Sequence, residues 1–441
     1  MQGRSSALAL QLILTLRVSS FYMRNVLPIV LLMCCFGCNA QKSNNKNIDN
    51  KIITAAERTE VYVPLLKGKR VAVFANHTAT IGKTHLVDSL QKLGVNIVKA
   101  FGPEHGFRGT ADAGQKLDNY VDKATGIPVI SLYGKKRRPS AEDLADVDIL
   151  LFDIQDVGVR FYTFISSLQE YMEAAFENSK PLMILDRPNP NGHYVDGPVL
   201  DTTFRSFVGM QPVPIVYGMT MGEYAMMIAG EKWLTAKANA KHDYYKTAEN
   251  SKDTAFHFMV IKCQNYDHNS RYELPVKPSP NLPDFASIFW YPSTCFFEGT
   301  VLSEGRGTDH PFCIFGHPTL PKNLYSFTPT SREGATAPKL KDKLCYGWNL
   351  YDSRTHLENK VVSRIYLKYL IEAYQLFPEK DSFFIRPKTG QYFFDKLAGD
   401  DNLRKQLLAG KSEAEIRAGW QPKLEAFKTI RKKYLLYKDF E

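Results

Sequence analysis

The sequence of 441 residues contains none of the short motifs that most often mark nucleotide or zinc sites. No Gly-x-Gly-x-x-Gly opens a helical pattern and no Gly-x-x-x-x-Gly-Lys-Ser/Thr occurs, which disfavours a bound nucleotide. The histidines are dispersed, without His-Glu-x-x-His or His-x-His spacing. The four cysteines beyond residue 38 include no Cys-x-x-Cys pair, which disfavours a zinc site. We therefore expect neither a metal nor a cofactor.

Those four cysteines, Cys263, Cys295, Cys313 and Cys345, are too few and too far apart to define a disulfide framework. An exported protein could form one or two bridges from them. Buried free thiols explain them equally well, because cysteine is among the most often buried residue types. The sequence leaves both states open.

Charge of one sign is not concentrated anywhere except at 135–138, Lys-Lys-Arg-Arg. A solvated loop explains this run more simply than a nucleic-acid site, so we predict no nucleic-acid partner. The formal net charge of +10 is otherwise spread along the chain. Such a moderate surplus suits an anionic, cell-wall-like partner.

The N-terminus is typical of an exported lipoprotein. Met23-Arg24 is followed by the apolar run 26–35 and by Gly37-Cys38, a pattern that resembles a bacterial lipoprotein signal peptide. We predict a signal peptide over 1–37, with Met23 as a possible true start. Lipidated Cys38 and a polar tether over 38–51 follow it. The protein would then be anchored to a membrane on its extracytoplasmic, most simply periplasmic, side. An uncleaved N-terminal anchor is the alternative.

From residue 70 to about 263, short apolar runs alternate with helical patterns. We predict parallel strands because these runs are apolar on both faces. An α/β fold follows, with a Rossmann-like doubly wound sheet over 52–300 and a smaller α+β auxiliary domain over 301–441. The active site is expected in the cleft between them. The predicted strands are 70–75, 96–101, 128–132, 149–153, 181–185 and 256–262.

Polar, Gly- or Pro-rich sequence follows five of these strands. In open α/β sheets the ligand crevice lies at the carboxyl ends of the strands. The densest such segment is Phe101–Gly109, Phe-Gly-Pro-Glu-His-Gly-Phe-Arg-Gly, in which three glycines permit tight turns. Because catalytic side chains must be aimed, this density favours Glu104 as a catalytic acid over a plain surface turn.

A glycosidase needs an acid to protonate the leaving oxygen, together with a second carboxylate or a substrate acetamido group. We predict Glu104 as the acid/base and Asp153 or Asp156, which follow a buried strand, as its partner. Helix capping or loop bracing is the alternative role for such an aspartate. The predicted substrate-binding residues also lie in the strand-end loops or in the Gly- and Pro-rich segments near 281 and 304: Asn76, His105, Arg108, Arg160, Tyr162, Arg187, Asn189, Asn281, Glu304 and Arg306.

Taken together, these motifs resemble the exo-β-N-acetylmuramidase family, glycoside hydrolase family 171, formerly a domain of unknown function. The resemblance rests on 101–109, 153–163, 186–190, 278–283, 297–308 and the closing 434–437. It implies a Rossmann-like catalytic domain with an auxiliary domain. It also implies release of N-acetylmuramic acid from non-reducing ends of peptidoglycan fragments during cell-wall turnover or recycling. The family's proposed catalytic glutamate corresponds to Glu104.

N-acetylmuramic acid differs from N-acetylglucosamine by a lactyl carboxylate, so a selective site should offer a cation. We expect Arg187 to provide it, with Arg306 as second choice. Two other functions remain open. One is a non-catalytic muropeptide-binding lipoprotein. The other is a metal-dependent hydrolase that uses His77, His105, Asp153 and Asp156.

Overall fold

The central sheet of the protein consists of the six predicted strands and one more. The computed structural model describes residues 51–441 except 105, 110–117, 248–257 and 361–362. The six parallel strands pair in the order β6-β4-β1-β7-β8-β9, which is the doubly wound 3-2-1-4-5-6 order of Rossmann folds. They are β1 (Val71–Ala75), β4 (Ile97–Gly102), β6 (Pro128–Ser131), β7 (Ile149–Asp153), β8 (Leu182–Leu185) and β9 (Phe258–Ile261).

The seventh strand, β5 (Tyr120–Val121), was not predicted. It pairs antiparallel with β6 at one edge of the sheet. Both of its residues are exposed, so it lacks the apolar run that identifies the other strands. A further hairpin, β2 (Thr80–Ile81) and β3 (Thr84–His85), follows β1.

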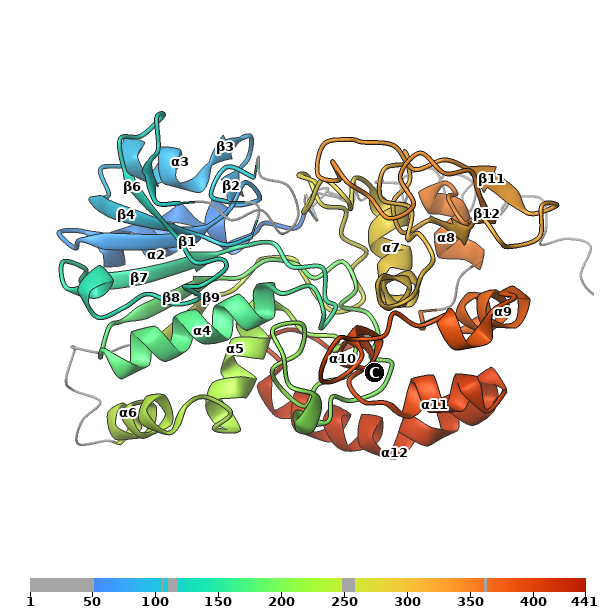
Figure 1. The fold of residues 1–441 in the computed structure, drawn as a ribbon. Helices are drawn as coiled ribbons and strands as arrows, with labels where there is room; N and C mark the ends of the chain where they lie inside the picture. The colour runs from blue at the N-terminus through green and yellow to red at the C-terminus, as the bar shows by residue number, and fades with distance from the viewer. Residues whose placement is uncertain (1–50, 105, 110–117, 248–257, 361–362) are drawn as a thin grey trace, which may run out of the picture. The chain divides into compact units, whose positions relative to one another are not determined.

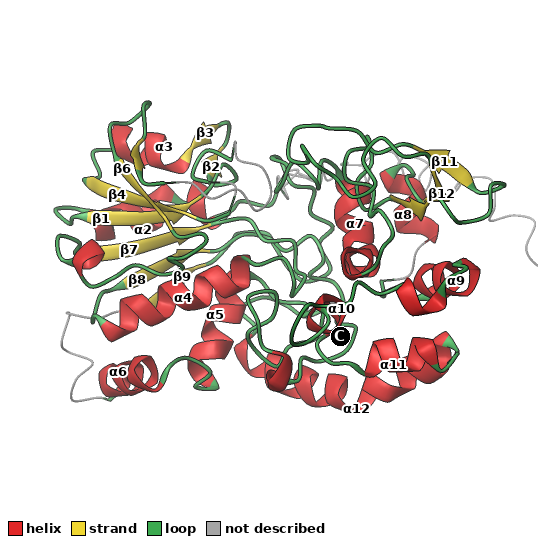
Figure 2. Cartoon of the chain, viewed as in Figure 1, coloured by secondary structure: helices red, strands yellow, loops and turns green. Residues whose placement is uncertain are grey.

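Helices cover both faces of this sheet because each strand is apolar on both sides. Along β1, Ala72 and Phe74 belong to one buried cluster, which also contains residues of α4 and α5. Val71 and Val73 belong to a second cluster with residues of α2 and α3. Figures 1 and 2 show the sheet from its edge, with α4 and α5 on one side of the strands. The first helices are α2 (Thr59–Leu66), α3 (Leu86–Lys92), α4 (Phe164–Glu177), α5 (Met221–Gly230) and α6 (Ala236–Lys246).

The second part of the chain is α+β, as predicted. An antiparallel sheet in the order β10-β12-β11 comprises β10 (Ile314–His317), β11 (Tyr325–Phe327) and β12 (Cys345–Asn349). Residues 51–441 group as one unit, so our boundary at residue 300 stays a prediction. The remaining helices are α7 (Phe285–Thr294), α8 (Arg354–Lys360), α9 (Lys368–Leu376), α10 (Phe393–Ala398), α11 (Asn402–Leu408) and α12 (Glu413–Arg431).

Helix α12 returns the chain to the first sheet. It begins with the predicted capping box, in which Ser412 and Glu415 bond to each other's backbone N–H groups. After α12, the Tyr437 hydroxyl donates to Asp186 Oδ2 at 2.7 Å. Asp186 lies directly after β8 and also accepts hydrogen bonds from Thr220 and Gly222, which begin α5. The end of the chain is thus fixed to the end of a central strand.

The cysteines resolve the question that the sequence left open. Cys263, Cys295, Cys313 and Cys345 are all buried free thiols. Across the described part of the chain, none of the helices has the length and apolar character needed to cross a bilayer.

Removal of the aromatic side chain at the centre of the sheet should strongly destabilise the fold. Phe74 is fully buried and packs its ring against Phe152 at 5.4 Å and Tyr171 at 5.0 Å between centroids. We expect Phe74→Ala to lower the free energy of unfolding by about 3–5 kcal/mol. Leu93→Ala, at a side chain that is 52% exposed, is the control and should cost less than about 0.5 kcal/mol. Urea unfolding of both variants checks this; equal losses would contradict it.

Candidate active site

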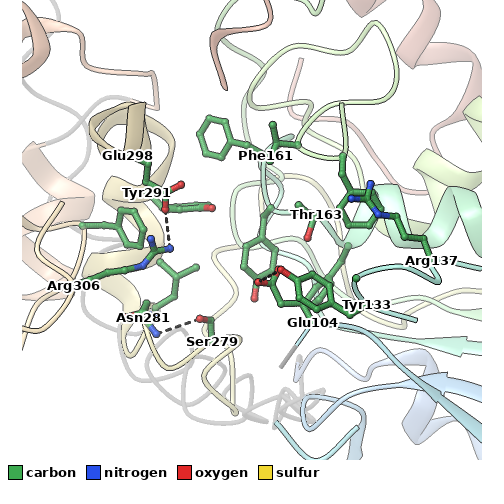
Figure 3. Close-up of a pocket in the computed structure, with 17 residues that line it drawn as sticks. Glu104, Tyr133, Arg137, Phe161, Thr163, Ser279, Asn281, Tyr291, Glu298 and Arg306 are labelled. Carbon is green, nitrogen blue, oxygen red and sulfur yellow. Dashed lines mark hydrogen bonds and ion pairs between the residues drawn. The ribbon is translucent and has the colours of Figure 1, made fainter. Parts of the chain in front are cut away.

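The loops after three strands of the sheet, β4, β6 and β7, form one side of a pocket of about 390 Å³. Glu104 follows β4, Tyr133 and Arg137 follow β6, and the segment 161–164 follows β7. Residues between 279 and 312 line the opposite side, as Figure 3 shows. The pocket therefore lies at the carboxyl ends of the parallel strands, where doubly wound sheets bind ligands.

Glu104 lies on the sheet side of this pocket and is half-buried. The Tyr133 hydroxyl donates to Glu104 Oε1 at 2.9 Å, and Figure 3 shows the two side chains together. Burial and the nearby negative charge of Glu104 raise the pKa of Tyr133, so the phenol stays a donor at neutral pH. The carboxylate is thus held in one orientation from the neighbouring strand's loop.

The turn around Glu104 needs its glycines for two different reasons. Gly106 and Gly109 have φ of 77° and 76°, as predicted, and a Cβ on Gly109 would overlap the His77 ring. Gly102 does not have a positive φ. A Cβ there would lie only 3.0 Å from the backbone nitrogen of Phe107, so close packing of the turn favours glycine. The glycines that indicated a site in the sequence therefore do constrain the backbone of this turn.

A second carboxylate, Glu298, lines the opposite side of the pocket. It belongs to the short 3₁₀ helix Cys295–Gly299 and pairs with Arg306 at 2.7 Å. Arg306 also contacts Glu304 at 3.5 Å, and Lys339 pairs with Glu304 at 2.9 Å. Two acids and two bases therefore form a cluster without net charge, of which Glu298 and Arg306 reach the pocket (Figure 3).

Burial raises the pKa of Glu298 above its ordinary value, although Arg306 opposes the rise. Burial also acts on Glu304, but Lys339 and Arg306 together hold the pKa of that carboxyl below its usual range. The two acids of the cluster are therefore unequal. The one that faces the pocket is the more easily protonated.

Aromatic rings complete the pocket between the two carboxylates. Phe161, Tyr162 and Tyr291 pack edge to face, with centroids 5.3–6.0 Å apart in the pairs with Tyr291. The Tyr162 hydroxyl donates to Pro278 O at 2.8 Å, and Asn281 Nδ2 donates to Gly334 O at 2.8 Å. These rings offer flat apolar surface of the kind that stacks on a sugar face.

Four of the predicted site residues line the pocket: Glu104, Tyr162, Asn281 and Arg306. Glu304 lies behind Arg306, and its side chain is only 3% exposed. His105 and Cys38 lie outside the described residues. Most of the other predicted residues instead join segments of the fold.

The predicted catalytic partner Asp153 does not line the pocket. Arg187 Nε donates to Asp153 Oδ1 at 2.5 Å and Arg187 Nη2 to Oδ2 at 2.8 Å, with both side chains buried. Asp153 ends β7 and Arg187 follows β8. The arginine that we expected to bind the lactyl carboxylate is therefore paired with an internal acid and buried inside the protein.

Asp156 is likewise buried away from the pocket. One of its oxygens accepts hydrogen bonds from the Tyr217 hydroxyl and the Gly158 N–H. Arg160 is fully buried and donates to three backbone carbonyls, those of Pro198, Val213 and Leu397. Both side chains brace loops, which is the alternative role that the sequence left open for the aspartates.

The remaining three predicted binding residues also have internal partners. Arg108 pairs with Asp88 at 2.9 Å and Asp122 at 2.7 Å. Asn76 accepts from Thr78 N–H and hydroxyl. Asn189 Nδ2 donates to a backbone carbonyl in the loop before α5. None of the three lines the pocket.

Three residues that line the pocket were not among the site residues that we predicted. Glu298 was expected only to help form the far wall of a cleft with Asn281, and no strand precedes it to mark a sheet end. Arg137 was interpreted as part of a solvated basic run. Tyr133 was considered only as a stacking ring, whereas it hydrogen-bonds Glu104. The Tyr-Gly pair directly after a predicted strand was the available signal.

A metal site finds no support in the described part of the chain. No group of three or more His, Cys, Asp or Glu side chains there could hold a metal ion. Two of the residues considered for a metal-dependent hydrolase, Asp153 and Asp156, instead accept hydrogen bonds from Arg187 and Tyr217. His77 hydrogen-bonds the carbonyl of Lys277 through Nε2.

Comparison with known proteins identifies the family. Two family models, described as Exo-beta-N-acetylmuramidase NamZ, N-terminal and C-terminal, match residues 71–286 and 289–437 in succession. The chain belongs to this family. Peptidoglycan beta-N-acetylmuramidase NamZ of Bacillus subtilis (strain 168) is 38% identical over 393 residues, which cover 85% of this chain and 89% of that protein.

Two solved structures share the fold of this chain. A DUF1343 family protein from Bacteroides fragilis NCTC 9343 has a TM-score of 0.76 and 45% identity. A second one from the same organism has a TM-score of 0.69 and 28% identity. Each comparison covers 88% of this chain and 99% of the other. The predicted family, fold class and glycoside hydrolase activity are thereby confirmed.

The buried carboxyl of Asp156 should make stability depend on pH. Burial raises its pKa from 3.8 to about 7, although Tyr217 opposes the rise. At a pH between these two pKa values, the Asp156 carboxyl is ionised in the unfolded chain but still protonated in the folded protein. The free energy of unfolding should therefore fall as pH rises from about 4 to 7, by on the order of 1–4 kcal/mol from this group.

Asp156→Asn removes this titration. Urea unfolding at pH 4.5 and 7 should show a smaller loss of stability in the variant than in the wild type. Parallel pH profiles of the two proteins would mean that Asp156 is ionised in the folded state.

Proposed function

We propose that this protein is an exo-acting glycosidase that releases N-acetylmuramic acid from the non-reducing ends of peptidoglycan fragments in cell-wall turnover or recycling. The observation that carries the proposal is the pocket itself. Two carboxylates, Glu104 and Glu298, line its opposite sides with aromatic rings between them. Paired carboxylates across a sugar-sized site are the arrangement that most glycoside hydrolases use.

Glu104 is the proposed general acid/base. Its carboxyl group protonates the leaving glycosidic oxygen. Tyr133 contributes by orientation, since its hydroxyl holds Oε1 of Glu104 at 2.9 Å.

Glu298 replaces Asp153 and Asp156 as our candidate for the second carboxylate. Arg306, at 2.7 Å, holds it in place and offsets the cost of keeping it charged in a partly buried position. From the side opposite Glu104, it can attack the anomeric carbon, activate water or orient the substrate acetamido group. Each of these roles places negative charge beside a positively charged transition state.

Replacement of the proposed acid should abolish most turnover while the protein still folds. Glu104→Gln keeps the shape of the side chain but removes its acidic proton. We expect hydrolysis of an unactivated muramide to fall by about 10²–10⁴-fold. Glu142→Gln, at an exposed glutamate, is the matched control and should be unaffected. Near-normal activity of a folded Glu104→Gln variant would remove Glu104 from this role.

The same experiment separates the two sides of the pocket. Glu298→Gln should also lose activity, whereas Glu304→Gln tests the charge cluster without changing a pocket carboxylate. If the two variants lose activity equally, the cluster matters only for folding, and Glu298 is not the second group. Retained binding of N-acetylmuramic acid without turnover in the wild type would favour the non-catalytic muropeptide-binding alternative.

We also propose that Cys38 is lipidated and anchors the protein to a membrane on its extracytoplasmic side, where peptidoglycan is found. The support is the order of positive residues, apolar run and Gly37-Cys38 in the sequence. Cys38→Ser should block processing or release the protein into the soluble fraction. Fractionation and mass measurement of the mature N-terminus check this. Membrane association that survives the substitution would indicate an uncleaved anchor instead.

A further inference from the structure

The basic run at 135–138 contains one arginine that differs from its neighbours. Lys136 pairs with Asp143, and Arg138 pairs with Glu173 at 3.2 Å. Arg137 has no carboxylate within ion-pair distance among the described residues. It is also the member of the run that lines the pocket. The loop therefore anchors itself through two of its cations and directs another to the site.

Arg137 is held in place by an aromatic ring. Its guanidinium lies 4.1 Å from the centroid of the Phe207 ring, and Phe207 also lines the pocket. Stacking on a ring occupies the face of a guanidinium and leaves the N–H groups at its edge available. Those N–H groups match a carboxylate, which accepts two parallel hydrogen bonds from one arginine. Phe207 thus limits the motion of Arg137 without using its donors.

The other arginine of the pocket is not available in the same way. Arg306 is engaged by Glu298 and Glu304, and its cluster carries no net charge. A substrate carboxylate placed against that side would be repelled by Glu298 and Glu304, which both lie beside Arg306. On the Arg137 side, the nearest pocket acid is Glu104, whose charge affects Tyr133 in the same loop. Figure 3 shows Arg137 and Arg306 on opposite sides of the pocket.

We propose that Arg137, stacked on Phe207, binds the lactyl carboxylate of N-acetylmuramic acid and sets the preference of the enzyme for this sugar over N-acetylglucosamine. The inference rests on the proposed function, because it assigns a specificity residue to that same pocket. It replaces Arg187 and Arg306, the two arginines expected from the sequence. Arg187 is buried against Asp153, and Arg306 is neutralised by its own acids.

The test compares a chromogenic N-acetylmuramide with the matching N-acetylglucosaminide. Arg137→Ala should reduce kcat/KM for the muramide by roughly 10- to 100-fold, the effect of losing a charge-assisted hydrogen bond. The loss should appear mainly in KM. The kcat/KM for the glucosaminide should hardly change. The preference of the enzyme for the muramide over the glucosaminide should therefore become smaller. Arg137→Lys, which keeps the charge but not the bidentate fork, should recover part of the ratio.

Lys135→Ala is the matched control, since Lys135 lies in the same loop with the same charge but does not line the pocket. It should leave the ratio unchanged. Equal loss on both substrates in Arg137→Ala, or an unchanged ratio, overturns the inference while the glycosidase function stands. If Lys135→Ala narrowed the substrate ratio as much as Arg137→Ala, the preference would come from the general charge of the loop. That result would also overturn the inference.

Binding keeps the inference testable without turnover. Calorimetric titration should show that wild-type protein binds free N-acetylmuramic acid more tightly than N-acetylglucosamine, and that Arg137→Ala removes the difference. If the wild type hydrolyses neither substrate but this binding preference persists, the proposed function fails and the role of Arg137 stands. If the wild type binds both sugars equally, the role of Arg137 fails.

Discussion

The ion pair between Arg187 and Asp153 holds the carboxyl end of the sheet together. Asp153 is the last residue of β7, and Arg187 follows β8, its neighbour. Arg187 also donates to the carbonyl of Thr80, in the hairpin after β1. One guanidinium thus joins the segments that leave three adjacent strands, at the point where the strand order reverses. Breaking such a buried pair typically costs about 3–5 kcal/mol, because the remaining charge is left without a partner.

The sheet could be predicted from the sequence because its strands are buried on both faces. Burial on both faces requires a continuous apolar run, and six such runs became six parallel strands. The exposed edge strand Tyr120–Val121 has no such requirement and left no signal. Glu104 could be found because its turn is crowded, and crowding selects glycine, which is visible in a sequence.

The other site residues were harder to predict for a physical reason. A strand end that binds a ligand and a strand end that braces a loop use the same polar side chains. Arg160 is fixed by a carbonyl 237 residues away, and Asn281 by one 53 residues away, yet only Asn281 lines the pocket. Whether an arginine meets a ligand, an acid or a carbonyl depends on these long-range partners. Glu298 lies in a segment outside the sheet, so its sequence context suggested the far wall of the cleft but gave it no catalytic role.

The hydrogen bond from Tyr437 to Asp186 can form only when synthesis of the chain is almost complete. The carboxylate and the hydroxyl are separated by 251 residues. At about 5–20 residues per second, a ribosome needs roughly 10–50 seconds to make that interval. Throughout that time the end of β8 lacks a partner that the finished core contains. A chain truncated before Tyr437 would bury the Asp186 carboxyl without this hydrogen bond. Such a truncated chain would therefore fold less stably than the complete one.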